Sequence, residues 1–273
     1  MSKVISISNQ KGGTANTATC VSLGAALARE GKKVMAIDLN PQADLTACLG
    51  VRNPDDLDIT ISTLMLKAIN EERFDWKEGI IHTKEGISLV PSNLDLSGVE
   101  MNLVGTMNRE QALRQYVDKV KNNFDFVLID CPPTLGMLTI NALSAADSVI
   151  IPVQAHYLPA KGMKELLKTI SKVQRYVNPN LRIDGVLMTL VDNRTNFAKE
   201  VTETIRNDYG SHIKIFDANV PIRVKAAETT AMGVSIFEYE PKSDVAKAYA
   251  DLAKEVMKDG QREKTCNITG QCR

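Results

Sequence analysis

The chain has 273 residues, 44% of them hydrophobic, which suits one large domain with a sizeable buried core and is short for two independent domains. Lysine plus arginine and aspartate plus glutamate are balanced at 33 each, which excludes a strongly basic or acidic protein and confines any nucleic-acid surface to a local patch. The five cysteines match no zinc or redox spacing, and no apolar run reaches the roughly 18–20 residues of a membrane span, so we expect a cytoplasmic protein with reduced thiols.

Short apolar runs alternate with helical patterns from the N-terminus onward. In chain order the sequence predicts a strand at 4–8, a helix at 17–29, a strand at 34–38, a helix at 59–70, a weak strand near 80, a strand at 87–90, a helix at 109–122, a strand at 126–130, a helix at 135–145, a strand at 149–154, a helix at 160–176, a strand at 183–191, a helix at 198–209, a short strand at 213–216 and a helix at 243–257. This alternation predicts an α/β fold: a doubly wound, mostly parallel sheet with helices on both faces. We expect a single domain over residues 1–259 and a flexible polar tail over 260–273.

A glycine-containing loop joins the first strand to the first helix. Residues 10–18 read Gln-Lys-Gly-Gly-Thr-Ala-Asn-Thr-Ala. Small residues let backbone N–H groups close around phosphate oxygens, the helix N-terminus adds a positive dipole, and a threonine hydroxyl can hold Mg²⁺. Taken alone, the loop can equally be a tight turn with two glycines.

Two later strands end in aspartate, at Asp38 and Asp130. In open α/β sheets, ligands bind at the carboxyl ends of the strands, so these two residues and the loop are expected to converge on one place. Either aspartate alone can also be explained as a cap of the following helix. The convergence of the three loops favours a nucleotide site.

Longer stretches extend this pattern, at residues 129–136, 139–143, 151–154 and 192–196. In order and spacing they resemble the ParA/Soj/MinD family of deviant Walker P-loop ATPases, and its ParA/Soj partition branch in particular. The similarity runs from Lys3 to about Met257. The resemblance implies binding of ATP or ADP with Mg²⁺, a nucleotide-dependent homodimer, non-specific binding to DNA, a nucleoid-associated cytoplasmic location and a centromere-binding partner protein.

The phosphate loop departs from the family pattern Lys-Gly-Gly-x-Gly-Lys-Thr-Thr. Ala15 replaces a glycine, Asn16 replaces the phosphate-binding lysine, and Ala18 replaces a threonine. Asn40 stands where the family has the aspartate that orients the attacking water. Loss of a charge-assisted hydrogen bond costs about 1.5–3 kcal/mol, and loss of a general base costs about 10²–10⁴ in rate. Ala15 also adds a Cβ where the backbone is expected to need a positive φ or close phosphate approach.

Other family positions are kept. The resemblance assigns Lys11 to the signature lysine that reaches the partner's nucleotide, Thr17 to the Mg²⁺-binding hydroxyl, and Asp38 and Asp130 to the carboxylates near the metal. The predicted nucleotide-binding residues are Lys11, Gly12, Gly13, Thr14, Ala15, Asn16, Thr17, Ala18, Asp192, Val220 and Pro221. Lys11, Asp38 and the degenerate Asn40 form the predicted catalytic set. We expect weakened nucleotide binding and little or no hydrolysis.

The family's DNA contacts correspond here to Arg194, Arg223 and Lys225, with Arg175 and Lys199 as weaker candidates. Ordinary solvated surface charge is the alternative for each. The last predicted helix has an apolar face of the kind that packs against the body of a protein, and the tail lacks a bulky apolar face, so we expect no membrane binding.

Three functions remain distinct at this point. The first is a nucleotide-switched partition ATPase that binds DNA. The second is a non-hydrolysing binding or regulatory module of the same fold, which Asn16 and Asn40 favour. The third is a metabolic enzyme on this scaffold, such as an iron protein or a ligase-like synthetase. The iron-protein version needs cluster cysteines, and Cys131 has no suitably placed partner in the sequence.

Overall fold

An eight-stranded sheet forms the centre of the molecule. The computed structural model describes residues 2–103, 105, 107–155, 159–192 and 194–269. The strand order is β3-β4-β2-β5-β1-β6-β7-β8, and every neighbouring pair is parallel except β3 with β4. The strands are β1 Lys3–Ile7, β2 Val34–Asp38, β3 Ile81–His82, β4 Ile87–Val90, β5 Phe126–Asp130, β6 Ser148–Gln154, β7 Arg182–Val191 and β8 Ile215–Pro221.

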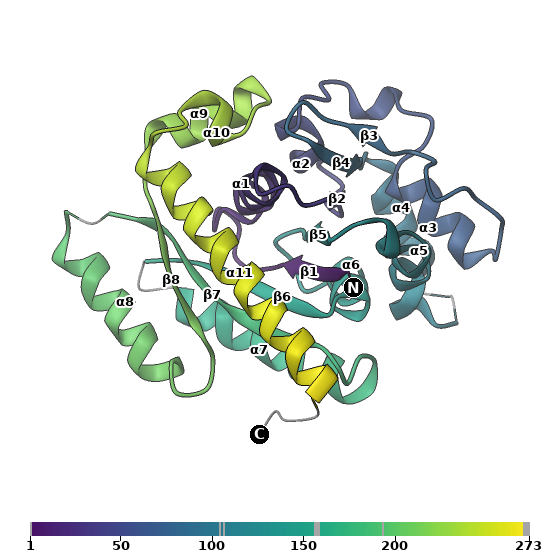
Figure 1. The fold of residues 1–273 in the computed structure, drawn as a ribbon. Coiled ribbons are helices and arrows are strands. Elements are labelled where there is room, and N and C mark those ends of the chain that lie inside the picture. The colour runs from purple at the N-terminus through teal and green to yellow at the C-terminus, as the bar shows by residue number, and fades with distance from the viewer. Residues whose placement is uncertain (1, 104, 106, 156–158, 193, 270–273) are drawn as a thin grey trace.

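Helices follow most strands and cover both faces of the sheet (Figure 1). Three short 3₁₀ turns, at Pro54–Asp56, Arg109–Gln111 and Lys121–Asn123, accompany them. The helices are α1 Asn16–Arg29, α2 Asp44–Cys48, α3 Ile61–Ile69, α4 Asp95–Leu103, α5 Ala112–Val120, α6 Met137–Ala145, α7 Pro159–Tyr176, α8 Asn196–Tyr209, α9 Val224–Met232, α10 Ile236–Tyr239 and α11 Asp244–Thr269.

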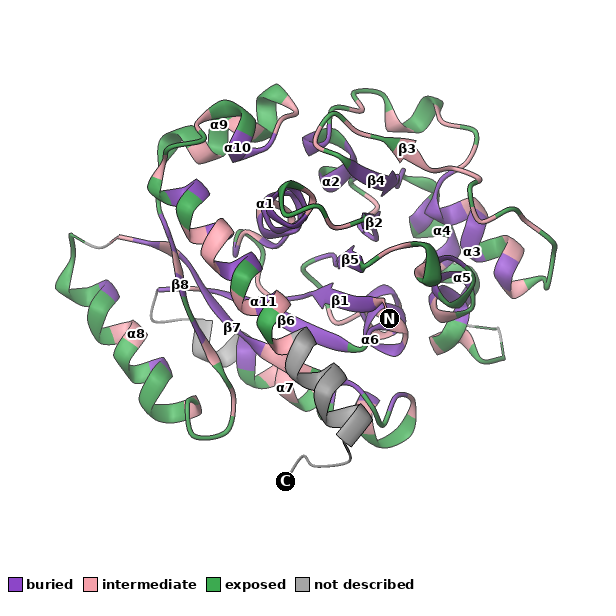
Figure 2. Ribbon diagram, viewed as in Figure 1, coloured by how far each residue is buried: buried purple, intermediate pink, exposed green. Residues whose placement is uncertain are grey.

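The strand residues alternate between two hydrophobic cores. On β5, Val127 and Ile129 belong to the core beneath α3, α5, α6 and α7, whereas Phe126 and Leu128 belong to the core beneath α1 and α11. Successive residues of a strand point to opposite faces, so a strand covered on both faces is apolar throughout. Figure 2 shows the central strands buried and the outer faces of the helices exposed. The predicted α/β class and its doubly wound, mostly parallel sheet are confirmed.

Helix α9 is attached differently from the helices over the cores. None of its residues is buried. Its end is held by a backbone contact between Gly233, with φ 66°, and Gly50, with φ 93°, just after α2. A Cβ added at Gly233 would lie 3.0 Å from the Cα of Gly50, which is a tight contact, and the positive φ of Gly233 also favours glycine. We call this the α2–α9 glycine contact.

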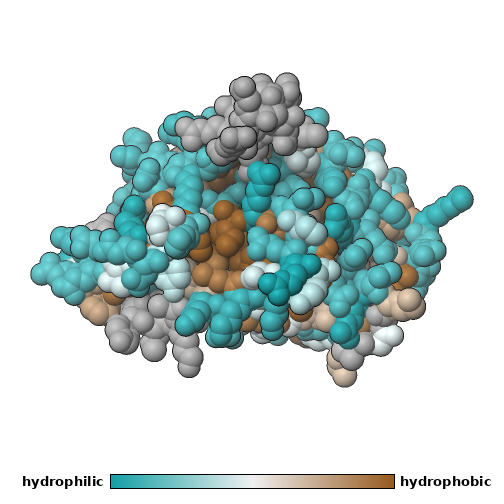
Figure 3. All heavy atoms as spheres, turned by 90° about the horizontal axis from the view of Figure 1, so that it is seen from below, coloured by the Kyte–Doolittle hydropathy of each residue, from teal (hydrophilic) through white to brown (hydrophobic). Residues whose placement is uncertain are grey.

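The C-terminal helix is longer than the sequence predicted. It continues past Met257 to Thr269, so residues 260–269 of the predicted tail are helical, and residues 270–273 lie outside the described part of the chain. Among the described residues, no helix is long and apolar enough to cross a membrane. The face seen in Figure 3 is largely hydrophilic, with a hydrophobic area near its middle.

Candidate functional site

The phosphate loop and the two strand-ending aspartates meet at one edge of the sheet. Strand β5 lies between β1 and β2, and its Asp130 is paired in register with Ile7 on one side and Asp38 on the other. The carboxyl ends of these three parallel strands therefore lie together. The predicted convergence of the three loops follows from this register.

The loop backbone takes a left-handed conformation at Ala15, with φ 67° and ψ 35°, directly before α1 begins at Asn16. A residue with a Cβ pays about 1–2 kcal/mol for this conformation. The position therefore needs the positive φ that the sequence analysis expected, and the alanine occupies it under strain. Gly13, with φ 76°, adopts the same region without that cost.

Asn16 is turned into the loop. Its side-chain Oδ1 accepts a hydrogen bond of 3.0 Å from the Thr14 hydroxyl, and the residue is 9% exposed. The Thr14 carbonyl accepts a bond of 3.0 Å from Thr189 on β7, which fixes this part of the loop to the sheet. A neutral amide bonded within the loop provides no positive charge for a phosphate.

Thr17 and Asp130 are joined beneath the loop. The Thr17 hydroxyl donates to Asp130 Oδ2 over 2.7 Å, and the other carboxyl oxygen, Oδ1, is buried with no hydrogen-bond partner. Burial, followed by the charge of Asp38, raises the pKa of Asp130 well above its usual value. A hydroxyl and a buried carboxyl oxygen lacking a partner form an oxygen donor set that suits Mg²⁺.

Asp38 is enclosed by α2 and fully buried. One carboxyl oxygen accepts hydrogen bonds from the Thr46 backbone N–H at 2.8 Å and from the Thr46 hydroxyl at 2.7 Å, and the other accepts from the Asn40 N–H at 3.0 Å. Burial raises the pKa of Asp38 to about 6 against the lowering effect of these bonds. Within the described ranges, no group of three or more histidine, cysteine, aspartate or glutamate residues is arranged to hold a metal ion. Direct metal contact by Asp38 stays a prediction.

Asn40 is bonded to the first residue of α2, Asp44. Its Nδ2 donates to Asp44 Oδ2 over 2.8 Å, and its Oδ1 accepts from the Gln42 N–H over 3.2 Å. Between them Ala43 adopts a second left-handed conformation, with φ 55°. Neither the bond to Asp44 nor the strain at Ala43 was predicted from the sequence. No periodic signal in the sequence marks this pair, because Asn40 precedes α2 and the left-handed Ala43 interrupts the backbone between them.

Two cavities open beside the loop. The polar cavity has a volume of about 280 Å³ and is lined by the phosphate loop together with Asn40 and Asp44. The apolar cavity has a volume of about 450 Å³ and lies among α1, α9, α10 and α11. Both are lined by Ala15, Ala18, Cys48 and Thr230, so they meet there. Their combined shape suits a ligand with an anionic end and a flat apolar end.

Of the predicted nucleotide-binding residues outside the phosphate loop, two line the apolar cavity and one does not. Val220 and Pro221 line the apolar cavity, as does Leu190. The φ of 50° at Leu190 marks a further strained position, which no sequence pattern indicated. Asp192 does not line it, since its carboxylate is bound by Arg194. Asn193, the next residue of this loop, lies outside the described residues.

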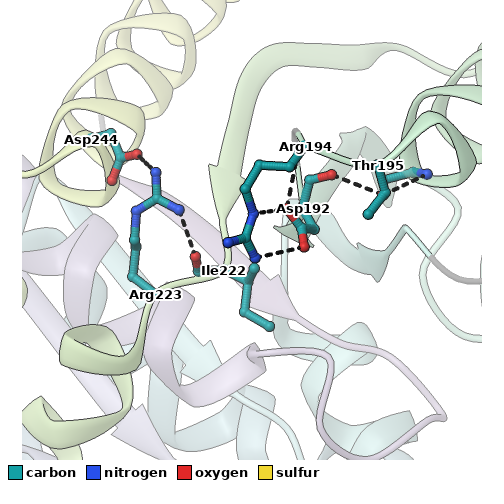
Figure 4. Close-up of polar contacts among 7 residues, drawn as sticks. Asp192, Arg194, Thr195, Ile222, Arg223 and Asp244 are labelled. Carbon is teal, nitrogen blue, oxygen red and sulfur yellow. Dashed lines mark hydrogen bonds and ion pairs between the residues drawn. The ribbon is translucent and has the colours of Figure 1, made fainter.

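The three main predicted DNA contacts are each paired with a carboxylate, and Figure 4 shows two of these pairs, Arg194 with Asp192 and Arg223 with Asp244. Arg194 binds Asp192 through two nitrogens at 2.9 Å, and its side-chain hydrogen bond, ahead of its charge, lowers the pKa of Asp192 to about 2. Arg223 pairs with Asp244. Lys225 binds Glu240 at 2.6 Å. Of the weaker candidates, Lys199 is exposed and the Arg175 guanidinium lies 6.0 Å from the Tyr176 ring centre.

Comparisons with known proteins agree with this geometry. A family model described as an AAA domain matches residues 2–183. The chain is 40% identical to the sporulation initiation inhibitor protein Soj of Bacillus subtilis, over 95% of this chain and all of that protein. It is 36% identical to the chromosome partitioning protein ParA of Myxococcus xanthus, over 94% of this chain and 88% of that protein.

A solved structure is similar over nearly the whole chain. It is the cobyrinic acid a,c-diamide synthase of Mycobacterium smegmatis with a bound ATP analogue and magnesium. The TM-score is 0.82, the identity is 34%, and the match covers 99% of this chain and 98% of that one.

Proposed function

This chain belongs to the ParA/Soj family of partition ATPases, and from that premise we propose that it binds ATP with Mg²⁺, dimerises when it does so, and binds DNA without sequence preference, with impaired hydrolysis. The observation that carries this proposal is the junction of the polar and apolar cavities at Ala15 and Ala18. A nucleotide has the matching division into phosphates and an apolar base.

Phosphate binding would rest on the loop backbone and on Lys11. Lys11 is the only cationic residue among the described residues that line the polar cavity. Asn16 is bonded to Thr14 and adds no charge. Thr17 and Asp130 would hold Mg²⁺, which supplies charge stabilisation at the phosphates. Binding is therefore expected to be weaker than with a lysine at position 16.

Impaired hydrolysis follows from the bonding of Asn40. An amide cannot take a proton from water, and both of its side-chain polar atoms already bond within residues 40–44. Phosphoryl transfer depends mainly on positioning and electrostatics, so the loss of charge at positions 16 and 40 lowers the rate.

The DNA surface would lie around Arg194, Arg223 and Lys225. All three are exposed and contributed by the segments around α8 and α9. As part of the same proposal, the chain works with a centromere-binding partner protein and is nucleoid-associated in the cytoplasm; the relatives named for chromosome partitioning support a role in partition. Affinity for DNA should fall steeply with salt, because phosphate contacts release counterions.

A second candidate is a non-hydrolysing binding or regulatory module of the same fold. The closed hydrogen bonds of Asn16 and Asn40 favour it. A synthase activity is not proposed, although a structural relative is named for one, because the relatives named Soj and ParA share up to 40% identity with this chain over most of its length.

Titration calorimetry with Mg²⁺ and ATP tests the proposal. The native chain is compared with a variant carrying Ala15→Gly, Asn16→Lys and Asn40→Asp. We expect weak binding by the native chain and binding about 10–100-fold tighter by the variant. DNA binding that depends on ATP and salt would then separate a partition switch from a nucleotide-binding module. Absence of binding in both proteins would contradict the proposal.

A further inference from the structure

Asp44 contributes a carboxylate to the polar cavity, whereas neither of the two strand-ending aspartates lines it. Asp44 is exposed and is the first residue of α2. It is the only carboxylate among the described residues that line the cavity. Asn40 and Lys11 line the same cavity. A carboxylate that meets water beside a bound phosphate in this cavity must therefore come from Asp44.

The hydrogen bonds around Asn40 fix how Asp44 is presented. Asn40 Oδ1 accepts from the Gln42 N–H, so its amide nitrogen is directed to Asp44, whose Oδ2 accepts it at 2.8 Å. Within the described part of the chain, Asp44 Oδ1 makes no hydrogen bond. One oxygen thus holds the carboxylate in place, and the other is available to accept a bond from water.

We infer that Asp44 is the water-orienting carboxylate of this chain, in the role that the family gives to position 40. Asn40 is then a positioning residue that acts through Asp44. The inference rests on the proposed function, and it concerns the slow hydrolysis that remains.

The proposed step balances with ATP and water alone. The water oxygen forms a bond to the γ-phosphorus, and the bond from that phosphorus to the β,γ-bridging oxygen breaks with its electron pair left on ADP. One water proton passes to Asp44 and then to solvent. The products are ADP and inorganic phosphate.

Single-turnover hydrolysis with saturating ATP and Mg²⁺ tests the inference, with ATP binding measured on the same proteins by calorimetry. Asp44→Asn keeps an acceptor for the Asn40 amide, so the fold is retained while the proton acceptor is lost. We expect its hydrolysis rate to fall by about 10²-fold or more while its Kd for ATP changes less than about threefold. Asp56→Asn, an exposed carboxylate outside the cavity, is the matched control and should hydrolyse as the native chain does.

The exchange variant, Asn40→Asp with Asp44→Asn, separates catalysis from structure. It returns the carboxylate to position 40 and the amide to position 44, so it should recover the rate that Asp44→Asn loses. Asn40→Asp alone places two carboxylates together, so its hydrolysis rate should rise less than that of the exchange variant. Native-like turnover by Asp44→Asn, or no turnover by the native chain above the enzyme-free rate, would overturn the inference. Failure of every protein to bind ATP would instead contradict the proposed function itself, and the inference with it.

Discussion

The phosphate loop and the surface around α8 and α9 differ in how far their polar side chains are buried and in the groups that these side chains bind. In the loop region the two asparagine side chains are buried and bonded to near neighbours, Asn16 to Thr14 and Asn40 to Asp44. On the α8–α9 surface the basic side chains are exposed and bonded to acids. Bonds in the first region are costly to alter because unpaired buried groups are penalised, whereas exposed ion pairs contribute about 0–1 kcal/mol.

The largest expected effect is a pH dependence of stability in the buried region. The pKa of Asp38 is about 6 in the folded chain against an ordinary value of 3.8. The folded chain holds the proton more tightly, so this contribution to stability is fully present below about pH 4 and is lost as the pH rises through 6. The difference is about 3 kcal/mol for this group.

Urea unfolding between about pH 4 and pH 7, without nucleotide or divalent cation, measures that dependence. Asp38→Asn should remove much of the decline in the free energy of unfolding. Asp130, whose pKa is raised in the same direction, should supply the remainder. An unchanged decline in Asp38→Asn would show that the carboxyl is not buried as described, and Asp56→Asn serves as the surface control.

The second-largest expected effect is that of a positive charge at position 16 on ATP binding. Asn16→Lys replaces the amide that bonds Thr14 with a cation for the phosphates, and should tighten ATP binding about 10–100-fold. Asn16→Gln is the matched control, because it lengthens the side chain without adding charge and should leave the Kd within about threefold. Equal gains from both changes, measured by calorimetry, would mean that release of Thr14 and not charge limits binding.

On the exposed surface, removal of the acidic partners should strengthen DNA binding modestly. The variant Asp192→Asn, Glu240→Gln and Asp244→Asn frees Arg194, Lys225 and Arg223. At about 0.2–1 kcal/mol for each exposed pair, the combined gain should be about tenfold. Fluorescence anisotropy with random-sequence duplex DNA and Mg²⁺-ATP measures it.

The gain should shrink at high salt, since the freed cations act through phosphates. Asp251→Asn, which removes the partner of Lys254 on α11, is the control and should change little. A tenfold gain in that control as well would assign the effect to net charge and not to the α8–α9 surface.

The smallest effect concerns backbone strain at Ala15 and Ala43. Glycine relieves a left-handed conformation worth about 1–2 kcal/mol but costs about 0.5–1 kcal/mol in chain entropy, so Ala15→Gly and Ala43→Gly should each stabilise by about 0.5–1 kcal/mol. Ala248→Gly, within α11, makes the same chemical change at helical φ and should destabilise by about 1 kcal/mol. Urea unfolding at one pH measures the change in the free energy of unfolding for each variant. A change of the same sign at all three positions would contradict the backbone strain at Ala15 and Ala43.

The sequence predicted the parts of the fold that repeat a simple pattern. The strands over residues 34–38, 87–90 and 126–130 are confirmed with the same bounds, because fully buried strands are continuous apolar runs. The positive φ at Ala15 was also foreseen from the family pattern. Strand β8 extends to Pro221, beyond the predicted end at 216, because its polar residues obscure the apolar run.

Other elements were missed for physical reasons. Helix α9 buries none of its residues, so no apolar period marks it in the sequence. Helices α2 and α10 are too short for a periodic pattern to develop. The bond from Asn40 to Asp44 and the pairing of Arg223 with Asp244 depend on rotamers and on segments distant in the chain. The positions of the candidate site residues were therefore predictable, but their partners were not.

At the α2–α9 glycine contact, two segments of the chain meet through backbone atoms alone. Gly50 lies just after the helix that begins with Asp44, and Gly233 caps the end of the helix that follows Arg223. Main-chain atoms in close contact cannot accommodate a shift of one segment by a change of rotamer, as side chains can. The replacements at positions 15, 16, 18 and 40 leave this contact in place. The positions that depart from the family's phosphate-loop pattern are thus separate from the residues that bring α2 and α9 together.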